Sequence, residues 1–259
     1  MNLFGPGDRQ AALDVLLARA RADDLVVGAA LTGSAAAGAA DSWSDIDLFL
    51  GVLDVPVALA RWSEFVHAEL GAVHHFDLPA GATVYRAFLL HNGLEVDLGL
   101  APTAEFGPVG DGAFQVLFGE ATARRSTATD VNHLVGLCWH HVLHARTSIE
   151  RGKPWRAEYW ISALRDHTLT MACVRLGLPS AYAKGADELP DDASAALVRD
   201  LSEAELWRAF RAATDGFVRE LRHADPDSRL APVLLGLADR RVHQAEQVRP
   251  SSGGPVRPR

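Results

Sequence analysis

The stretch from Leu31 to Leu48, LTGSAAAGAADSWSDIDL, restricts the fold of this chain more than any other part of the sequence. It follows a valine- and leucine-rich run, Leu25 to Leu31, which predicts a buried strand. Gly33 and Ser34 then predict a tight turn, where a residue without a side chain lets backbone N–H groups approach an anion. The small residues of 35–40 predict a short helix whose N-terminus faces the same place. Backbone amides and a helix N-terminus together are typical of a phosphate site.

Two acids begin the next apolar run. Asp45 and Asp47 lie at alternate positions of a predicted strand around Ile46 to Val52, so their carboxylates share one face of a sheet. Neighbouring carboxylates repel each other unless a cation lies between them, and Mg²⁺ prefers oxygen ligands. Asp97 has the same alternation in the run Glu95 to Leu98 and completes a set of three acids. Three carboxylates that hold two Mg²⁺ ions are typical of in-line transfer at phosphorus.

The rest of the first half predicts a small sheet with helices. Helical spacing of apolar residues indicates helices over Arg9 to Ala22 and Val57 to Leu70. Further strands are predicted at Val73 to Leu78, Val84 to Leu90 and Leu94 to Leu100. Because most of these strands follow one another directly, we expect an α+β fold with a mixed sheet backed by helices.

After Pro102 the hydrophobic period becomes helical, and we expect almost no further strand. Long helices are predicted over Asp130 to Glu150, Trp155 to Leu176, Ser202 to His223 and Leu230 to Gln247. They indicate a C-terminal helical bundle. We therefore expect a first domain over residues 1–124, a helical domain over 125–248 and a disordered tail over 249–259.

Composition excludes several classes of protein. Hydrophobic residues make up 48% and charged residues 22%, which is globular usage. A net charge of −8 disfavours a protein that grips a nucleic-acid backbone, so no nucleic-acid partner is expected. The N-terminal residues lack a signal-peptide pattern, and no segment reads as membrane-spanning. Two cysteines cannot build a disulfide framework, so we expect a soluble protein of the reducing cytoplasm.

The order of these motifs resembles the DNA polymerase beta-like nucleotidyltransferase superfamily. The resemblance rests on Gly33-Ser34, a small-residue stretch, the string Ser44-Asp45-Ile46-Asp47-Leu48 and a later strand acid, and it covers about residues 24–100. The chain length and the helical second half are similar to the small aminoglycoside and lincosamide nucleotidyltransferases. In those enzymes a nucleotidyltransferase domain precedes a helical domain that supplies part of the substrate pocket.

The resemblance implies roles for the motif residues. Gly33 and Ser34 would bind the β- and γ-phosphates of a nucleoside triphosphate. Asp45 and Asp47 would bind Mg²⁺, with two ions expected. Asp97 would be the third metal ligand, or the base that takes the proton from the acceptor hydroxyl.

Other members of the superfamily take this base from the helical domain, and Glu158 is the candidate here. Glu95 faces the same side of its strand as Asp97 and is a weaker rival. Lys184 precedes a glycine in a predicted loop, from which it could neutralise the triphosphate. For Glu158 and Lys184, an ordinary solvated side chain is the competing interpretation.

The resulting hypothesis is a cytoplasmic, Mg²⁺-dependent adenylyltransferase with ATP as co-substrate. It would transfer AMP to a hydroxyl of a small molecule, an aminoglycoside or lincosamide antibiotic by resemblance, and release pyrophosphate. A homodimer is expected from the same resemblance. Three alternatives remain open: a nucleotidyltransferase that modifies a protein, as in toxin–antitoxin systems; a template-independent polymerase or tRNA-end enzyme; and a nucleotide-binding regulator without turnover.

Overall fold

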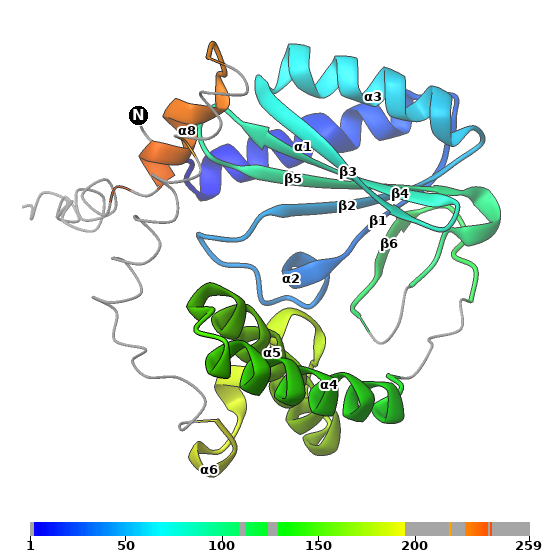
Figure 1. Ribbon diagram of the computed structural model, residues 1–259. Coiled ribbons are helices and arrows are strands. Elements are labelled where there is room, and N and C mark those ends of the chain that lie inside the picture. The colour runs from blue at the N-terminus through cyan, green and yellow to red at the C-terminus, as the bar shows by residue number, and fades with distance from the viewer. Residues whose placement is uncertain are drawn as a thin grey trace, which may run out of the picture. The chain divides into compact units, whose positions relative to one another are not determined.

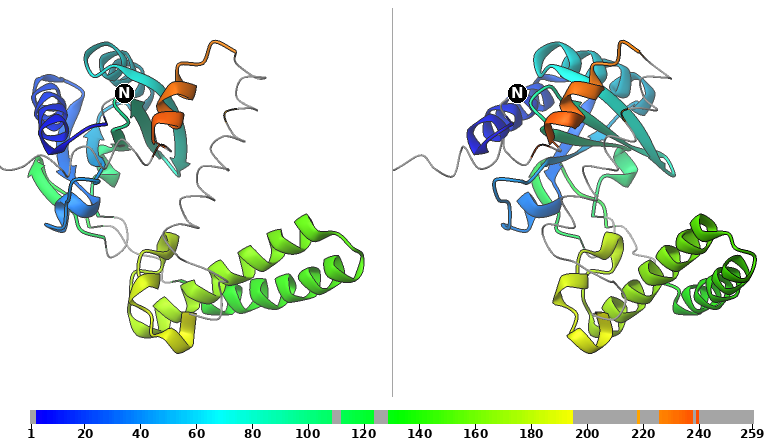
Figure 2. Two further views of the ribbon diagram at one scale, coloured as in Figure 1. Left: turned by 90° about the vertical axis from the view of Figure 1, so that its left-hand side faces the viewer. Right: turned by 60° about the vertical axis from the view of Figure 1, so that its left-hand side comes forward.

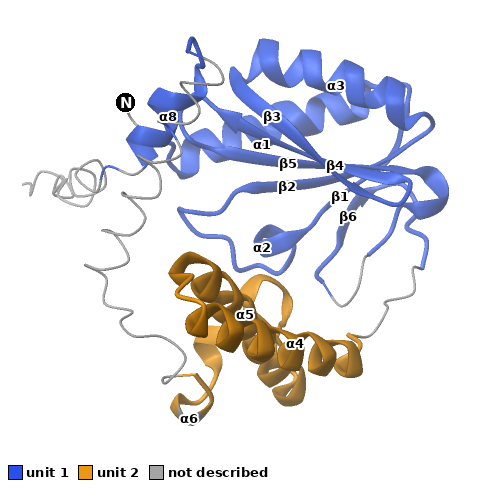
Figure 3. Cartoon of the chain, in the orientation of Figure 1, with its two compact units in different colours: residues 1–126, 206–259 blue, residues 127–205 orange. Residues whose placement is uncertain are grey.

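The computed structural model describes residues 3–108, 112–123, 129–194, 218, 226–237 and 239. The chain divides into two compact units (Figure 3). Unit 1 comprises residues 1–126 and 206–259, and unit 2 comprises residues 127–205. Of the helix predicted from Ser202 to His223, only Val218 is among the described residues, and the predicted tail over 249–259 lies outside them.

Unit 1 is built on a six-stranded mixed sheet with the strand order β3-β4-β5-β2-β1-β6 (Figure 1). Strands β2 and β5 are parallel, and the other neighbouring pairs are antiparallel. The strands are β1 (Val26–Leu31), β2 (Ile46–Val52), β3 (Ala72–Ala80), β4 (Thr83–Leu90), β5 (Glu95–Pro102) and β6 (Gln115–Phe118). The predicted α+β class and mixed sheet are confirmed.

Two helices cover one face of this sheet, α1 (Pro6–Ala22) and α3 (Val55–Glu69) (Figure 1). The side chain of Asp54 caps α3 by accepting a hydrogen bond from the N–H of Val57 at 3.0 Å. Apolar residues from both helices and the central strands form the main core, among them Leu16, Trp62, Val66, Leu48, Leu50 and Phe88. The burial of these residues explains why the strands are so apolar on this face.

Alternation along β2 sends its other residues to the opposite face. Leu48 and Leu50 enter the main core, whereas Phe49 belongs to a second buried cluster with Ala30, Ala101 and Phe106. Asp47 lies two residues before Phe49 in β2, so its side chain is on the same face as that of Phe49. This is the face that α1 and α3 do not cover. The strand therefore carries a helix-covered apolar face and a face with acids at one end.

The ring of Phe106 packs directly on two neighbouring glycines of the sheet. Gly28 in β1 is paired with Gly51 in β2. A Cβ atom on Gly28 would lie 2.6 Å from the ring of Phe106, and one on Gly51 would lie 2.8 Å from its Cβ. Any larger residue would displace this ring from the second cluster.

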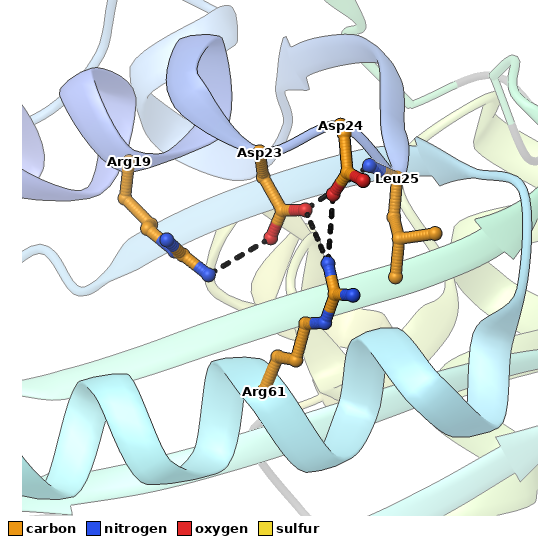
Figure 4. Close-up of polar contacts among 5 residues, drawn as sticks. All are labelled: Arg19, Asp23, Asp24, Leu25 and Arg61. Carbon is orange, nitrogen blue, oxygen red and sulfur yellow. Dashed lines mark hydrogen bonds and ion pairs between the residues drawn. The ribbon is translucent and has the colours of Figure 1, made fainter.

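A buried acid joins α1, β1 and α3 (Figure 4). Asp23 contacts Arg19 at 3.2 Å and Arg61 at 3.5 Å, and its Oδ1 accepts a hydrogen bond from the N–H of Leu25 at 3.1 Å. Arg61 also contacts the exposed Asp24 at 2.7 Å. This hydrogen bond lowers the pKa of Asp24. The network holds the start of β1 against both helices.

Strand β6 was not expected, because the sequence after Pro102 predicts almost no strand. It has four residues and pairs with β1 at the edge of the sheet. The short helix η1 (Thr103–Glu105) follows β5. Helix α8 (Leu230–Leu237) belongs to unit 1, where Leu237 and Leu3 both approach Gly93.

Unit 2 contains two long helices that lie side by side, α4 (Val131–Glu150) and α5 (Pro154–Leu176) (Figure 2). Gly152, with a φ of +61°, occupies the turn between them, and Gly177, with a φ of +70°, ends α5. Short helices follow: η2 (Ala181–Ala183), η3 (Ala186–Glu188) and α6 (Asp191–Ser194). The described part of unit 2 is thus a helical hairpin with short helices after it. Within the described residues, none of the helices combines the length and hydrophobicity that crossing a bilayer requires.

Candidate metal and phosphate site

The parallel pairing of β2 with β5 places two acids next to each other. Asp47 lies directly opposite Asp97 in this register. Paired residues on neighbouring strands point to the same face of a sheet, here the open one. Asp45 immediately precedes β2 and joins them, since one carboxylate oxygen from each of the three residues lies within 4.8 Å of the other two. The structure therefore brings together the three acids that the sequence singles out.

The chemistry of this acid set fits a divalent cation. Carboxylate oxygens are the ligands that Mg²⁺ prefers. One oxygen of Asp97, Oδ1, is buried and has no hydrogen-bond partner. A buried charged oxygen without a partner is costly, and a bound cation would remove that cost. Among the described residues, these three acids are the group of potential ligands that meets the geometry of a metal site.

The raised pKa values of two acids at this site also favour a bound cation. Burial raises the pKa of Asp97 from 3.8 to about 6, and the nearby carboxylates of Glu95 and Asp45 add to the effect. Burial also raises the pKa of Glu95, with contributions from Asp45 and Asp47. Negative charge thus accumulates where the strands meet, and a divalent cation would offset it.

Gly33 lies against the carboxylate of Asp47. Its φ is +61°, in the left-handed region that favours glycine. A Cβ atom there would overlap Oδ2 of Asp47 and lie 2.7 Å from its Cγ. The N–H of the preceding residue, Thr32, donates to the backbone oxygen of Asp47 at 3.1 Å. The turn and the three acids therefore form one candidate site, in which only glycine fits at position 33.

Ser34 follows in the first turn of α2 (Gly33–Ala36). Its Oγ is buried and has no hydrogen-bond partner, as expected of a group that binds a ligand. The first N–H groups of a helix lack partners within the helix, so this turn also offers backbone donors. The turn thus combines the close approach of Gly33 to Asp47 with a buried, unpartnered hydroxyl on Ser34, which is the kind of donor that a phosphate site uses.

Helix α2 is shorter than the sequence suggests. It ends at Ala36, although small residues continue to Ala40. Gly38 has a φ of +68°, and its N–H donates to the oxygen of Ala35 at 3.2 Å. The N–H of Ala39 donates to the oxygen of Ser34 at 2.9 Å, which completes a Schellman motif. One turn has little macrodipole, so anion binding here depends on individual N–H and O–H groups rather than on a helix dipole.

The loop between α2 and β2 is organised by Asp41, which sequence reasoning missed. Its Oδ1 accepts hydrogen bonds from the N–H of Trp43 at 2.8 Å and from Oγ of Ser44 at 3.1 Å. These hydrogen bonds, chiefly that from Trp43, lower the pKa of Asp41. They fix Ser44 and thereby the start of the acid strand at Asp45. The spacing D-S-W-S was the available signal, because aspartate followed by serine and a turn is typical of such side-chain-to-backbone bonds.

The two remaining predicted residues belong to unit 2. Glu158 is exposed on α5 and accepts a hydrogen bond from Oγ of Ser162 at 3.1 Å. Lys184 is exposed directly after η2, and its N–H donates to the oxygen of Ala181 at 3.1 Å. Their roles as a base and as a phosphate ligand stay predictions.

Comparisons with known proteins add the following. No protein-family model matches the chain, and no curated protein sequence matches it. Among solved structures, the chain is similar to an aminoglycoside 6-adenyltransferase from Bacillus subtilis, with 15% sequence identity and a TM-score of 0.31. The similarity covers 70% of this chain and 74% of that chain.

Proposed function

We propose that the chain is a Mg²⁺-dependent nucleotidyltransferase that transfers AMP from ATP to a hydroxyl of a small molecule. The observation that carries this proposal is the convergence of Asp45, Asp47 and Asp97, with carboxylate oxygens within 4.8 Å of one another, beside the Gly33-Ser34 turn. A triad of carboxylates next to unsatisfied hydrogen-bond donors suits a triphosphate together with its metal ions. An isolated structural role for the acids does not account for the buried, unpartnered oxygens of Ser34 and Asp97.

In the proposed reaction the acceptor oxygen forms a bond to the α-phosphorus of ATP. The bond from that phosphorus to the bridging oxygen of the β-phosphate breaks, and pyrophosphate leaves. Two Mg²⁺ ions held by Asp45, Asp47 and Asp97 would neutralise charge on the transferring phosphoryl group. The donors of Gly33 and Ser34 hold the β- and γ-phosphates, so that the α-phosphorus lies over the acids.

The acceptor proton has to pass to a base. Asp97 is the proposed base, because β5 flanks β2 on the side away from β1, the strand that leads into the Gly33 turn. Glu158 is the alternative base, and Lys184 is proposed to bind the triphosphate. An aminoglycoside or a lincosamide is the proposed class of acceptor, and a homodimer the proposed assembly.

The test is direct detection of product. The protein is incubated with Mg²⁺, the four ribonucleoside triphosphates and a panel of aminoglycosides and lincosamides, and product masses are recorded. We expect an acceptor heavier by one AMP, together with pyrophosphate, and no product with Asp47→Asn. Asp14→Asn is the matched control, since Asp14 is an exposed residue of α1 whose Oδ1 accepts a hydrogen bond from Gln10. Full activity of Asp47→Asn would overturn the proposal.

A further inference from the structure

A continuous row of paired residues runs from the acids to the edge of the sheet. Asp47 is opposite Asp97, Asp97 is opposite Ala87 in β4, and Ala87 is opposite Phe76 in β3. Paired residues share a face, so Phe76 stands on the same open face as the acids. Two strand spacings of about 4.8 Å place Phe76 about 10 Å from Asp97.

A second apolar side chain accompanies Phe76 on this edge strand. Leu78 is opposite Tyr85, whose ring packs on Phe49 with centroids 5.8 Å apart. Phe76 and Leu78 are 50% and 52% exposed. On the other face of β3, Asp77 contacts Arg86 at 2.6 Å, and the ring of His75 hydrogen-bonds that of His67 in α3 at 2.8 Å. Exposed apolar side chains on an edge strand are available for contact with a ligand or with another chain.

The order of the Gly33 turn, the acids and the edge strand indicates from which side an acceptor would approach. The phosphate turn at Gly33 contacts Asp47 from one side, and the row continues from Asp97 to β4 and β3 on the other side. In phosphoryl transfer the attacking oxygen approaches opposite the leaving group. If pyrophosphate leaves at Gly33 and Ser34, the acceptor enters over β5, β4 and β3.

We propose that Phe76 and Leu78 bind an apolar part of the acceptor, and so act as positioning residues for its hydroxyl. This inference rests on the proposed function and narrows its substrate class. The acceptor carries an apolar ring or alkyl group about 10 Å from the hydroxyl that attacks. A polycation without such a group gains nothing from this surface, so an amphipathic hydroxyl compound is favoured over an aminoglycoside.

The experiment measures binding to the full chain by calorimetry, in Mg²⁺ and the unreactive analogue α,β-methylene-ATP. The probes with an apolar group are lincomycin and n-octyl glucoside below its micelle concentration. The probes without one are kanamycin and methyl glucoside. We expect at least one apolar probe to bind and to lose affinity about tenfold in Phe76→Ser and in Leu78→Ser. Affinity for α,β-methylene-ATP should not change, and Phe76→Leu should recover most of the loss.

The matched control is Leu53→Ser, because Leu53 is 64% exposed and lies at the opposite end of β2 from Asp47. Binding of the nucleotide analogue without binding of either apolar probe would overturn this inference and leave the proposed chemistry standing. So would an affinity that Phe76→Ser and Leu78→Ser leave unchanged. Dissociation of an oligomer in Phe76→Ser would also overturn the inference, because Phe76 and Leu78 would then form a contact between copies of the chain. Failure to bind the analogue at all would overturn the proposed function itself.

Discussion

Gly33, in the turn after β1, lies in contact with the carboxylate of Asp47 in β2, and the space between them leaves no room for a side chain on residue 33. The left-handed backbone of Gly33, with a φ of +61°, turns its Cα toward the Asp47 carboxylate. The turn proposed to bind phosphate thereby lies directly against an acid proposed to bind metal. Binding of a triphosphate and binding of its metal ions should therefore depend on the same few atoms.

Replacing Gly33 with alanine should disable this site. The new Cβ would displace the carboxylate of Asp47, so we expect transfer activity to fall at least about 100-fold, the scale of a misplaced reacting group. Gly152→Ala is the matched control, because Gly152 has the same φ of +61° and no atom within 4 Å of an added Cβ. Both variants should lose about 1 kcal/mol of stability to backbone strain, measured by urea unfolding. Equal activity of the two variants would contradict the contact with Asp47.

Metal binding should depend on all three acids. We expect Mn²⁺, followed by electron paramagnetic resonance, to bind the wild type in the presence of ATP. Asp45→Asn, Asp47→Asn and Asp97→Asn should each weaken this binding about 10-fold or more, because each removes a charged oxygen ligand. Asp14→Asn should bind as the wild type does. Unchanged Mn²⁺ affinity in all three site variants would show that the acids hold no metal.

The stability of the metal-free protein should depend on pH through Asp97. Its pKa is raised in the folded state from 3.8 to about 6, so the folded state disfavours the charged carboxylate. Well below pH 3.8 the carboxyl is protonated in both the folded and the unfolded state, and the folded state carries no penalty. Stability should therefore fall as the pH rises from about 4 to about 6 and then level off.

Thermal melting in a chelator would show this dependence. Asp97→Asn should reduce the pH dependence in that window, and Mg²⁺ should raise the melting temperature of the wild type above about pH 6. A wild-type profile identical to that of Asp97→Asn would contradict the electrostatic description of the site.

The choice of base can be tested with two conservative variants. If Asp97 takes the proton, Glu158→Gln should keep kcat within about threefold, as substitution of an exposed helix residue does. Asp97→Asn should lower kcat by a factor of about 100 or more, since it removes a base and a metal ligand. A loss of kcat in Glu158→Gln, with Mn²⁺ and ATP affinity retained, would assign the base to unit 2 instead.

The Asp23 network should contribute to stability and not to chemistry. Asp23→Ala removes the buried partner of Arg19, Arg61 and the Leu25 N–H, and we expect a loss of about 2 kcal/mol in the free energy of unfolding. The neighbouring variant Asp24→Ala removes an exposed carboxylate and should change stability little. Activity per folded molecule should stay that of the wild type in both, which a combined unfolding and activity assay would show.

Much of the fold could be predicted because its signals are local. The strands at Ile46–Val52 and Thr83–Leu90 and the helix at Val55–Glu69 lie within two residues of the predicted bounds. Apolar side chains alternate along the strands and recur every three to four residues along the helix, as burial of one face requires. Other features escaped prediction, among them β6 and the early end of α2. Strand β6 has only four residues and exists through its pairing with β1, and α2 stops early because Gly38 closes it with a left-handed turn.

The candidate site also has a part that the local sequence predicts and a part that depends on tertiary structure. By itself, the sequence determined which acids are candidates for the site, because the spacing of Asp45 and Asp47 and the alternation around Asp97 follow from the geometry of a single strand. Only the tertiary structure decided that Asp97 pairs with Asp47 and that Gly33 rests on it. It also decided that the row ends at Phe76. Pairing between strands depends on register, and register is set by packing of the whole sheet against α1 and α3 rather than by any one segment.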